Sequence, residues 1–180
     1  MEKVENFDIL YCFDDNYNVQ EITSIISYLD KVEKRQNINI IHTSGSIKDQ
    51  LPDTIKNHKN LQKYNFFWIM GNHDQFLRGK ILLSGKSHSF YKIDRYEFRH
   101  IKTTQEKDYT LQFSGHYHPK CLLKYNGSSY NYKCFILGEN FCILPSFGTY
   151  TGGLDVESEA LKRVLKNKKI DLIVIGKRNI

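Results

Sequence analysis

The sequence predicts an α/β protein that begins with a β-α-β unit and continues as a strand-rich, sandwich-like remainder. Two apolar segments, DILYCF at residues 8–13 and INIIH at residues 38–42, have the composition of buried strands. Between them, residues 21–35 repeat apolar side chains at helical spacing, and one face is formed by Ile22, Ile25, Ile26 and Leu29. Because β-α-β units usually build parallel sheets, the two strands are expected to pair in parallel.

Residues 66–180 have a different pattern, in which short segments of aromatic and β-branched residues alternate with Gly, Asn and Ser. The pattern predicts strands at residues 66–70, 89–100, 108–118, 132–137 and 140–145. An amphipathic helix is expected at residues 157–168 and a last strand at residues 170–176. At 180 residues the chain is long enough to bury a substantial core.

Positive charge is concentrated in the second part of the chain. Residues 1–65 hold 8 Lys and Arg against 10 Asp and Glu, whereas residues 66–180 hold 18 against 10, a net charge of +8. This balance favours a polyanionic partner, either nucleic acid or a phosphate ester, although a merely solvated basic surface has the same composition. No pattern points to a particular protein partner.

The sequence indicates a cytoplasmic protein without a transmembrane segment. No run of eighteen apolar residues occurs, and the amino terminus MEKVENFDIL carries acids where a signal peptide would carry bases. The cysteines are too sparse for a disulfide scaffold and lack the Cys-x-x-Cys pairs of zinc sites. We expect reduced, mostly buried thiols at Cys12, Cys121, Cys134 and Cys142.

The histidines provide the clearest candidate for chemistry. GNHD at residues 71–74 follows an aromatic strand segment, and GHYH at residues 115–118 ends another predicted strand. Side chains two apart in a strand share a face, so His116 and His118 are expected to point the same way. With the amide oxygen of Asn72, two such imidazoles form a donor set that transition metals bind. Ordinary structural roles are expected for other histidines, namely His42, His58 and His88.

These motifs belong to a longer set, which comprises WIMGNHD at 68–74, FRHI at 98–101, SGHYHPK at 114–120 and ILPSFGTYTGGLDV at 143–156. On this set, residues 66–180 resemble the calcineurin-like metallophosphoesterases, and within them the bacterial ligase-associated DNA-damage-response endonucleases. The resemblance implies part of a metallophosphoesterase-like β-sandwich and a metal-dependent hydrolase that acts on phosphodiesters or nucleic acid. It also implies a dinuclear metal centre, with His118 on one metal and, on the other, Asn72, His100 and His116.

The resemblance further assigns catalytic roles to the two residues that follow Asn72. His73 would meet the phosphate and act as general acid, and Asp74 would orient its ring, since a carboxylate commonly fixes the tautomer of a catalytic histidine. Two divalent cations would activate water for attack on phosphorus. Manganese is the expected metal, with iron or zinc as alternatives, because mixed nitrogen and oxygen ligands discriminate poorly between them.

Two metal motifs of this family are missing. The family has an Asp-x-His upstream and then a Gly-Asp whose aspartate bridges both metals, and neither occurs in this chain. Without that carboxylate, two close cations would repel each other with too little compensation. We therefore expect an impaired hydrolase, and the alternative is a non-catalytic chimeric remnant or a metal-binding or nucleic-acid-binding module.

Residues 1–65 carry other motifs, ILYCFDDNYNVQEITSIISYLDK at residues 9–31 and LPDTIKNHKNLQKYNFF at residues 51–67. They resemble the start of the retaining, nucleotide-sugar-dependent glycosyltransferases of the lipopolysaccharide type. The resemblance implies nucleotide-sugar binding at Asp14 or Asp15, although the family's Asp-x-Asp metal motif is absent. The predicted organisation is thus a glycosyltransferase-like fragment, 1–65, fused to the carboxy-terminal part of a phosphoesterase domain, 66–180. A glycosyltransferase-related protein is a third interpretation, and replacement of the missing metal ligands by Asp14, Asp15 and His42 is a further hypothesis.

Overall fold

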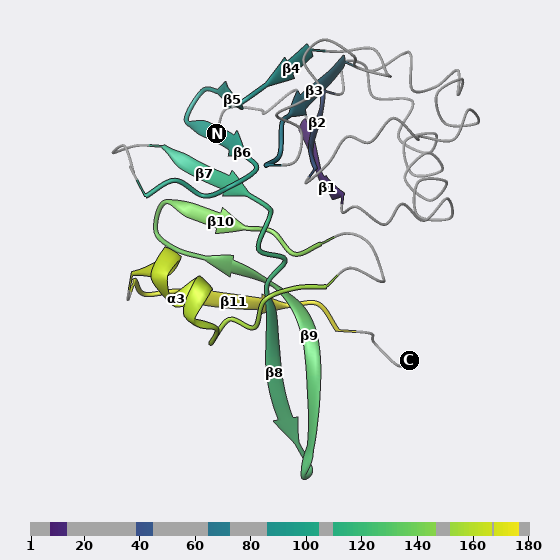
Figure 1. The fold of residues 1–180 in the computed structure, drawn as a ribbon, viewed down its shortest axis with the longest axis vertical. Coiled ribbons are helices and arrows are strands. Elements are labelled where there is room, and N and C mark those ends of the chain that lie inside the picture. The colour runs from purple at the N-terminus through teal and green to yellow at the C-terminus, as the bar shows by residue number, and fades with distance from the viewer. Residues whose placement is uncertain are drawn as a thin grey trace, which may run out of the picture.

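The computed structural model describes residues 8–13, 39–44, 65–72, 86–104, 110–146, 152–166 and 168–176 (Figure 1). Within these ranges the chain is a mixed α/β protein made mainly of strands, which agrees with the α/β class expected from the sequence. The strands form two sheets, and a single described helix, α3, packs against the larger one (Figure 1).

The smaller sheet contains four parallel strands in the order β1-β2-β3-β4. Their bounds are β1 Asp8–Phe13, β2 Asn39–Ser44, β3 Asn65–Ile69 and β4 Lys86–His88. The parallel pairing of β1 with β2 confirms the arrangement expected of a β-α-β unit. The helix predicted at residues 21–35 lies outside the described residues.

The larger sheet is mixed and runs in the order β11-β9-β10-β7-β6-β5, with β8 paired to β9. Its bounds are β5 Phe90–Ile93, β6 Tyr96–Arg99, β7 Leu111–Ser114, β8 Lys120–Tyr125, β9 Ser128–Leu137, β10 Phe141–Ile143 and β11 Asp171–Val174. Strands β6, β7 and β10 run parallel to one another. The other pairings in this sheet are antiparallel.

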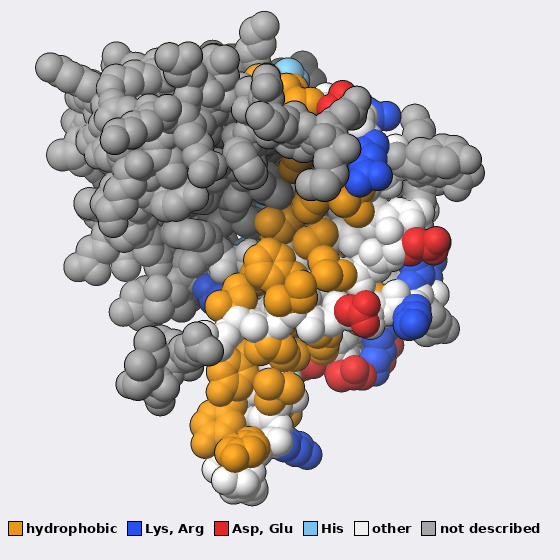
Figure 2. Space-filling model, turned by 180° about the vertical axis from the view of Figure 1, so that it is seen from behind, with side chains coloured by type: hydrophobic (Ala, Val, Ile, Leu, Met, Phe, Trp, Pro, Cys, Tyr) orange, Lys and Arg blue, Asp and Glu red, His pale blue; other side chains and the backbone are white. Residues whose placement is uncertain are grey.

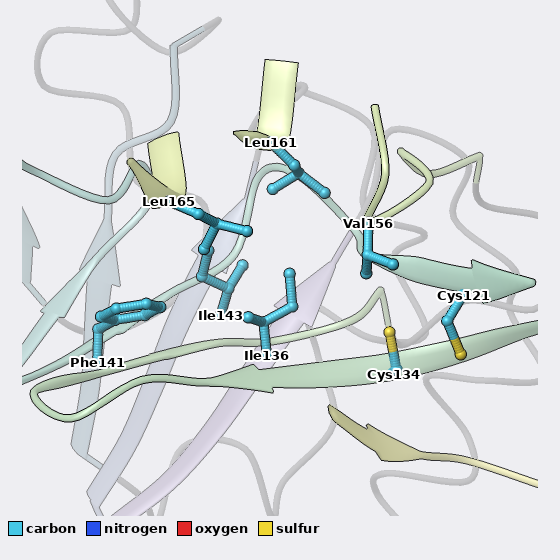
Figure 3. Close-up of a cluster of buried hydrophobic side chains, with 8 residues drawn as sticks. All are labelled: Cys121, Cys134, Ile136, Phe141, Ile143, Val156, Leu161 and Leu165. Carbon is cyan, nitrogen blue, oxygen red and sulfur yellow. The ribbon is translucent and has the colours of Figure 1, made fainter. Parts of the chain in front are cut away.

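One face of the larger sheet forms a core with α3, Glu159–Leu165 (Figure 3). The helix begins at Ser158, whose hydroxyl accepts a hydrogen bond from the Leu161 N–H at 3.4 Å. It ends at Lys166, which adopts a left-handed conformation with φ of 49°. The buried side chains of this core are Cys121, Cys134, Ile136, Phe141, Ile143, Val156, Leu161 and Leu165.

The opposite face of the larger sheet packs on the smaller sheet, which gives a sandwich-like arrangement. Ile69 of β3 is fully buried and clusters with Phe98 of β6. Phe98 and Phe113 lie opposite each other in the sheet, and their rings stack at 5.3 Å. Ring stacking of Phe67 on Tyr91, at 4.2 Å, also joins the two sheets.

Strands β8 and β9 form a long hairpin that projects from the body of the protein (Figure 1). Asn126 and Gly127 form its turn with φ of 48° and 75°, the signs that a two-residue hairpin turn requires. Hydrophobic side chains continue along the surface to this hairpin (Figure 2), and Tyr125 is 71% exposed there. The side chains whose burial stabilises the hairpin therefore lie at its base, where Cys121 and Cys134 are part of the core.

The sequence patterns did not predict two of the strands, β4 and β8. The pair Asn126-Gly127 is a hairpin signal from which β8 could have been predicted. The strand predicted at residues 108–118 was too long, because β7 ends at Ser114 and the two histidines beyond it lie in a turn. Among the described residues, no helix is long and apolar enough to cross a membrane.

We predict that Leu161→Ala lowers the free energy of unfolding by about 2–5 kcal/mol, because it leaves a cavity beneath α3. Leu161 is 0% exposed, whereas Leu172, on the edge strand β11, is 38% exposed. The matched control Leu172→Ala should therefore cost no more than about 1 kcal/mol. Urea unfolding followed by circular dichroism measures both, and equal losses would contradict the assigned core.

Cys121, Cys134 and Cys142 are buried free thiols, as expected from the sequence, whereas the side chain of Cys12 lies outside the described part of the chain. Burial raises the pKa of the Cys142 thiol to about 11. Burial, reinforced by the neighbouring Cys121, raises the pKa of Cys134 to about 12. Both thiols therefore remain protonated in the folded protein at a pH where the unfolded chain already loses these protons.

These thiols should make the protein less stable in alkali. Their contribution is fully present below about pH 8.5, the pKa of an unperturbed thiol, and is lost as the pH rises toward the raised values. Each such thiol lowers the free energy of unfolding by up to about 1.4 kcal/mol per pH unit. In Cys142→Ala, urea unfolding under reducing conditions should show a shallower decline, and an unchanged slope would refute the assignment.

Candidate functional site

Three segments that are far apart in the sequence end at one edge of the fold. His100 follows β6 directly, and His116 lies two residues beyond the end of β7. Because β6 and β7 are parallel, their carboxyl ends lie at the same edge of the sheet. Asn72 lies three residues beyond the end of β3 in the smaller sheet.

Asn72, His100 and His116 form a cluster around one ring nitrogen. Nε2 of His100 lies 3.0 Å from Oδ1 of Asn72 and 3.1 Å from Nδ1 of His116. The two imidazole rings meet edge to face, with centroids 4.9 Å apart. His100 is 4% exposed, whereas Asn72 is exposed, so the cluster opens outward on the Asn72 side.

Hydrogen bonds alone cannot make both short contacts of Nε2 of His100 favourable at the same time. Nε2 of His100 carries at most one proton, which it can donate well to only one of its two neighbours. If Nδ1 of His116 donates to Nε2 instead, Nε2 faces the Asn72 oxygen with its lone pair. A cation, in contrast, interacts favourably with all three donor atoms at the same time.

The donor spacing fits a transition metal. Two atoms that each lie about 2.1 Å from one metal ion, at the right angle of octahedral coordination, are about 3.0 Å apart. The two short contacts in the cluster, at 3.0 and 3.1 Å, match this spacing. The described residues contain no group of three His, Cys, Asp or Glu that could hold a metal. A metal bound at this cluster would therefore take its third donor from the amide oxygen of Asn72.

A tight turn at residues 115–118 presents the two histidines of GHYH. The Gly115 N–H donates to the His100 carbonyl at 3.1 Å, and the Tyr117 N–H donates to the Gly115 carbonyl at 2.7 Å. His116 and His118 have φ of 61° and 47°. The expectation that both project from one face of a strand was therefore wrong, because hydrogen bonding across only three residues turns the chain immediately after β7.

Both histidines occupy a conformation that non-glycine residues adopt rarely, at a cost of roughly 1–3 kcal/mol each. His118 also precedes Pro119, and a following proline favours extended backbone. Strain of this kind persists only where surrounding structure enforces it, and it clusters at functional sites.

Tyr117 connects the turn to the α3 core. Its ring meets the ring of His116 edge to face at 5.0 Å, and it packs against the buried cluster beneath α3. Burial raises the pKa of the Tyr117 phenol above its ordinary value.

A buried polar network supports the segment that carries His100. The Thr103 N–H donates to Oε1 of Gln112 at 2.8 Å, and Nε2 of Gln112 donates to the carboxylate of Glu97 at 3.3 Å. Arg99 pairs with the same carboxylate. Gln112 is 4% exposed, and no motif in the sequence marked it as part of the site.

The structure thus brings together three of the residues predicted to bind metal and describes the backbone of His118. The predicted catalytic pair, His73 and Asp74, lies outside the described residues. So do the predicted nucleotide-sugar ligands, Asp14 and Asp15.

Comparison with known proteins identifies a similar fold. The crystal structure of nuclease MPE from Pseudomonas putida superimposes with a TM-score of 0.60 and 18% sequence identity, covering 94% of this chain and 83% of that chain. At this identity the similarity concerns the fold. No protein-family profile and no curated protein matches the chain. The division of the chain at residue 65 stays a prediction.

We predict that Gln112→Ala lowers the free energy of unfolding by about 2–3 kcal/mol, since it leaves the Thr103 N–H and the Glu97 carboxylate without their amide partner. Asn131→Ala is the matched control, because Asn131 is an exposed amide on β9. It should change stability by less than about 0.5 kcal/mol. Similar urea midpoints for the two variants would show that the network contributes nothing to the support of His100.

Proposed function

We propose that this protein is a metal-dependent phosphodiester hydrolase, impaired by the absence of the Asp-x-His and Gly-Asp motifs, whose first metal ion is held by Asn72, His100 and His116. The observation that carries the proposal is that two further donor atoms, Oδ1 of Asn72 and Nδ1 of His116, lie 3.0 and 3.1 Å from Nε2 of His100. The resemblance of the GNHD and GHYH motifs to metallophosphoesterases supports it, as does the likeness of the fold to a nuclease.

Within this proposal the residues have separate tasks. Asn72, His100 and His116 hold a divalent cation, manganese in the first instance, and His118 holds a second. The bound metal supplies Lewis-acid activation of water and neutralises charge on the phosphate. His73 binds the phosphate and donates a proton to the leaving oxygen, and Asp74 orients its ring.

Nucleic acid is the proposed substrate class. The net charge of +8 in residues 66–180 favours a polyanion over a small neutral ester. The neighbour in fold is itself called a nuclease. The backbone of a nucleic acid carries the negative charge that a basic surface binds and the phosphodiester bond that the proposed hydrolase cleaves.

A second candidate function is metal binding without turnover. The sequence lacks the Asp-x-His and Gly-Asp pairs that supply the remaining ligands in metallophosphoesterases. A mononuclear centre held by Asn72, His100 and His116 would bind phosphate without activating water efficiently. The protein would then act as a nucleic-acid-binding module.

Asn72→Ala tests the metal site with little risk to folding, because Asn72 is exposed. We expect the affinity for Mn²⁺, measured by titration calorimetry, to fall at least about tenfold. Asn131→Ala, the exposed amide on β9, should bind Mn²⁺ like the unaltered protein. Failure of the unaltered protein to bind any divalent cation would refute the proposal.

Hydrolysis of bis-p-nitrophenyl phosphate and of single-stranded DNA separates the two candidates. Turnover that falls by about 10²-fold or more in His73→Ala, with Mn²⁺ binding retained, supports the hydrolase. Mn²⁺ binding without turnover in the unaltered protein identifies the binding module instead.

A further inference from the structure

Residues 152–156, here called the strap, run along the turn that carries His116 and His118. The Leu154 N–H donates to the Tyr117 carbonyl at 3.1 Å, and the Leu154 carbonyl accepts from the Lys120 N–H at 2.9 Å. The Val156 N–H then donates to the Lys120 carbonyl at 2.8 Å, and Asp155 forms a parallel bridge with Lys120. The strap therefore holds the backbone on both sides of His118.

The far end of the strap is anchored in the core. Val156 is 8% exposed and packs in the α3 cluster beside Cys121 (Figure 3). Asp155 accepts the Glu157 N–H through its carboxylate at 2.8 Å and the Ser158 N–H through its carbonyl at 2.9 Å. Because α3 begins directly after these bonds, the strap cannot shift without disturbing the start of the helix.

Gly153 lies so close to the turn that the position has no room for a side chain. A Cβ atom at this position would lie 2.1 Å from the His118 carbonyl oxygen and 3.3 Å from its carbonyl carbon. Both are backbone atoms, so a methyl group cannot be accommodated by rotation of a side chain. The adjacent Gly152 has nothing within 4 Å of the equivalent position.

We propose that Gly153 is a positioning residue for the candidate metal site, and that the strap sets the conformation of the turn containing His116 and His118. The strained φ of both histidines requires an external restraint, and the hydrogen bonds of the strap provide one. That Gly153 affects metal binding rests on the proposed function. That it affects the positions of the His116 and His118 rings does not depend on the proposed function.

The decisive experiment compares Gly153→Ala with Gly152→Ala. In the metal-free proteins, ¹H–¹⁵N spectra of the imidazole rings should show shifted His116 and His118 resonances in Gly153→Ala. Gly152→Ala should leave them unchanged, and His88, which lies beside β3, should be unchanged in both. Unshifted His116 and His118 resonances in folded Gly153→Ala would overturn the proposal.

Metal affinity supplies the second readout. Gly153→Ala should weaken Mn²⁺ binding at least about tenfold at a temperature where circular dichroism shows it fully folded, and Gly152→Ala should not. A purely structural role would lower the melting temperature and leave the affinity of the folded protein intact. If the unaltered protein binds no Mn²⁺, the proposed function fails, whereas the ring resonances still decide the role of Gly153.

A second pair of variants covers the case in which Gly153→Ala does not fold. Leu154→Pro removes the N–H that donates to Tyr117, and Leu154→Ala keeps it. Leu154 is 37% exposed, so neither change empties the core. Shifted His116 and His118 resonances in the proline variant alone support the strap, and identical spectra for the two variants refute it.

Discussion

The parallel pairing of β6 with β7 is the constraint on which the candidate site depends. Its register places Arg99 opposite Ser114, so both strands leave the sheet side by side. The hydrogen bond from the Gly115 N–H to the His100 carbonyl extends this pairing beyond the strands. His100 and His116 are thus brought together by main-chain contacts, which do not depend on the protonation of either ring.

Two separate cores converge on this point. The cluster of Ile69 with Phe98 joins the ends of β3 and β6, and so relates Asn72 to His100. The α3 cluster supports the turn through Tyr117 on one side and through Val156 and the strap on the other. Close-packed cores have little free space to absorb a displacement of the residues around them. A donor set that lies between two such cores is therefore held to a narrow range of geometries.

Backbone strain and buried polarity both accompany the site. Left-handed φ at His116 and His118 opposes folding, and so does burial of the Glu97 and Gln112 side chains unless they are paired. The strap offsets the first cost and the mutual hydrogen bond of these side chains offsets the second. Such local costs are typical of functional regions, where geometry matters more than the stability of each element.

The sequence by itself determined the α/β class, most of the strand positions and the identity of the candidate donors, because composition, periodicity and the GNHD and GHYH motifs are local features. It placed the two histidines of GHYH wrongly on one face of a strand, since the turn depends on hydrogen bonds to His100 and to residues 152–156, which are distant in the chain. Gly153 lies in the ILPSFGTYTGGLDV motif, but its role beside the turn does not follow from any sequence pattern, and neither does the role of Gln112. Each role exists only where another segment approaches the residue. Tertiary structure alone decided the convergence of Asn72, His100 and His116, because three separate strand ends meet only when the two sheets have packed.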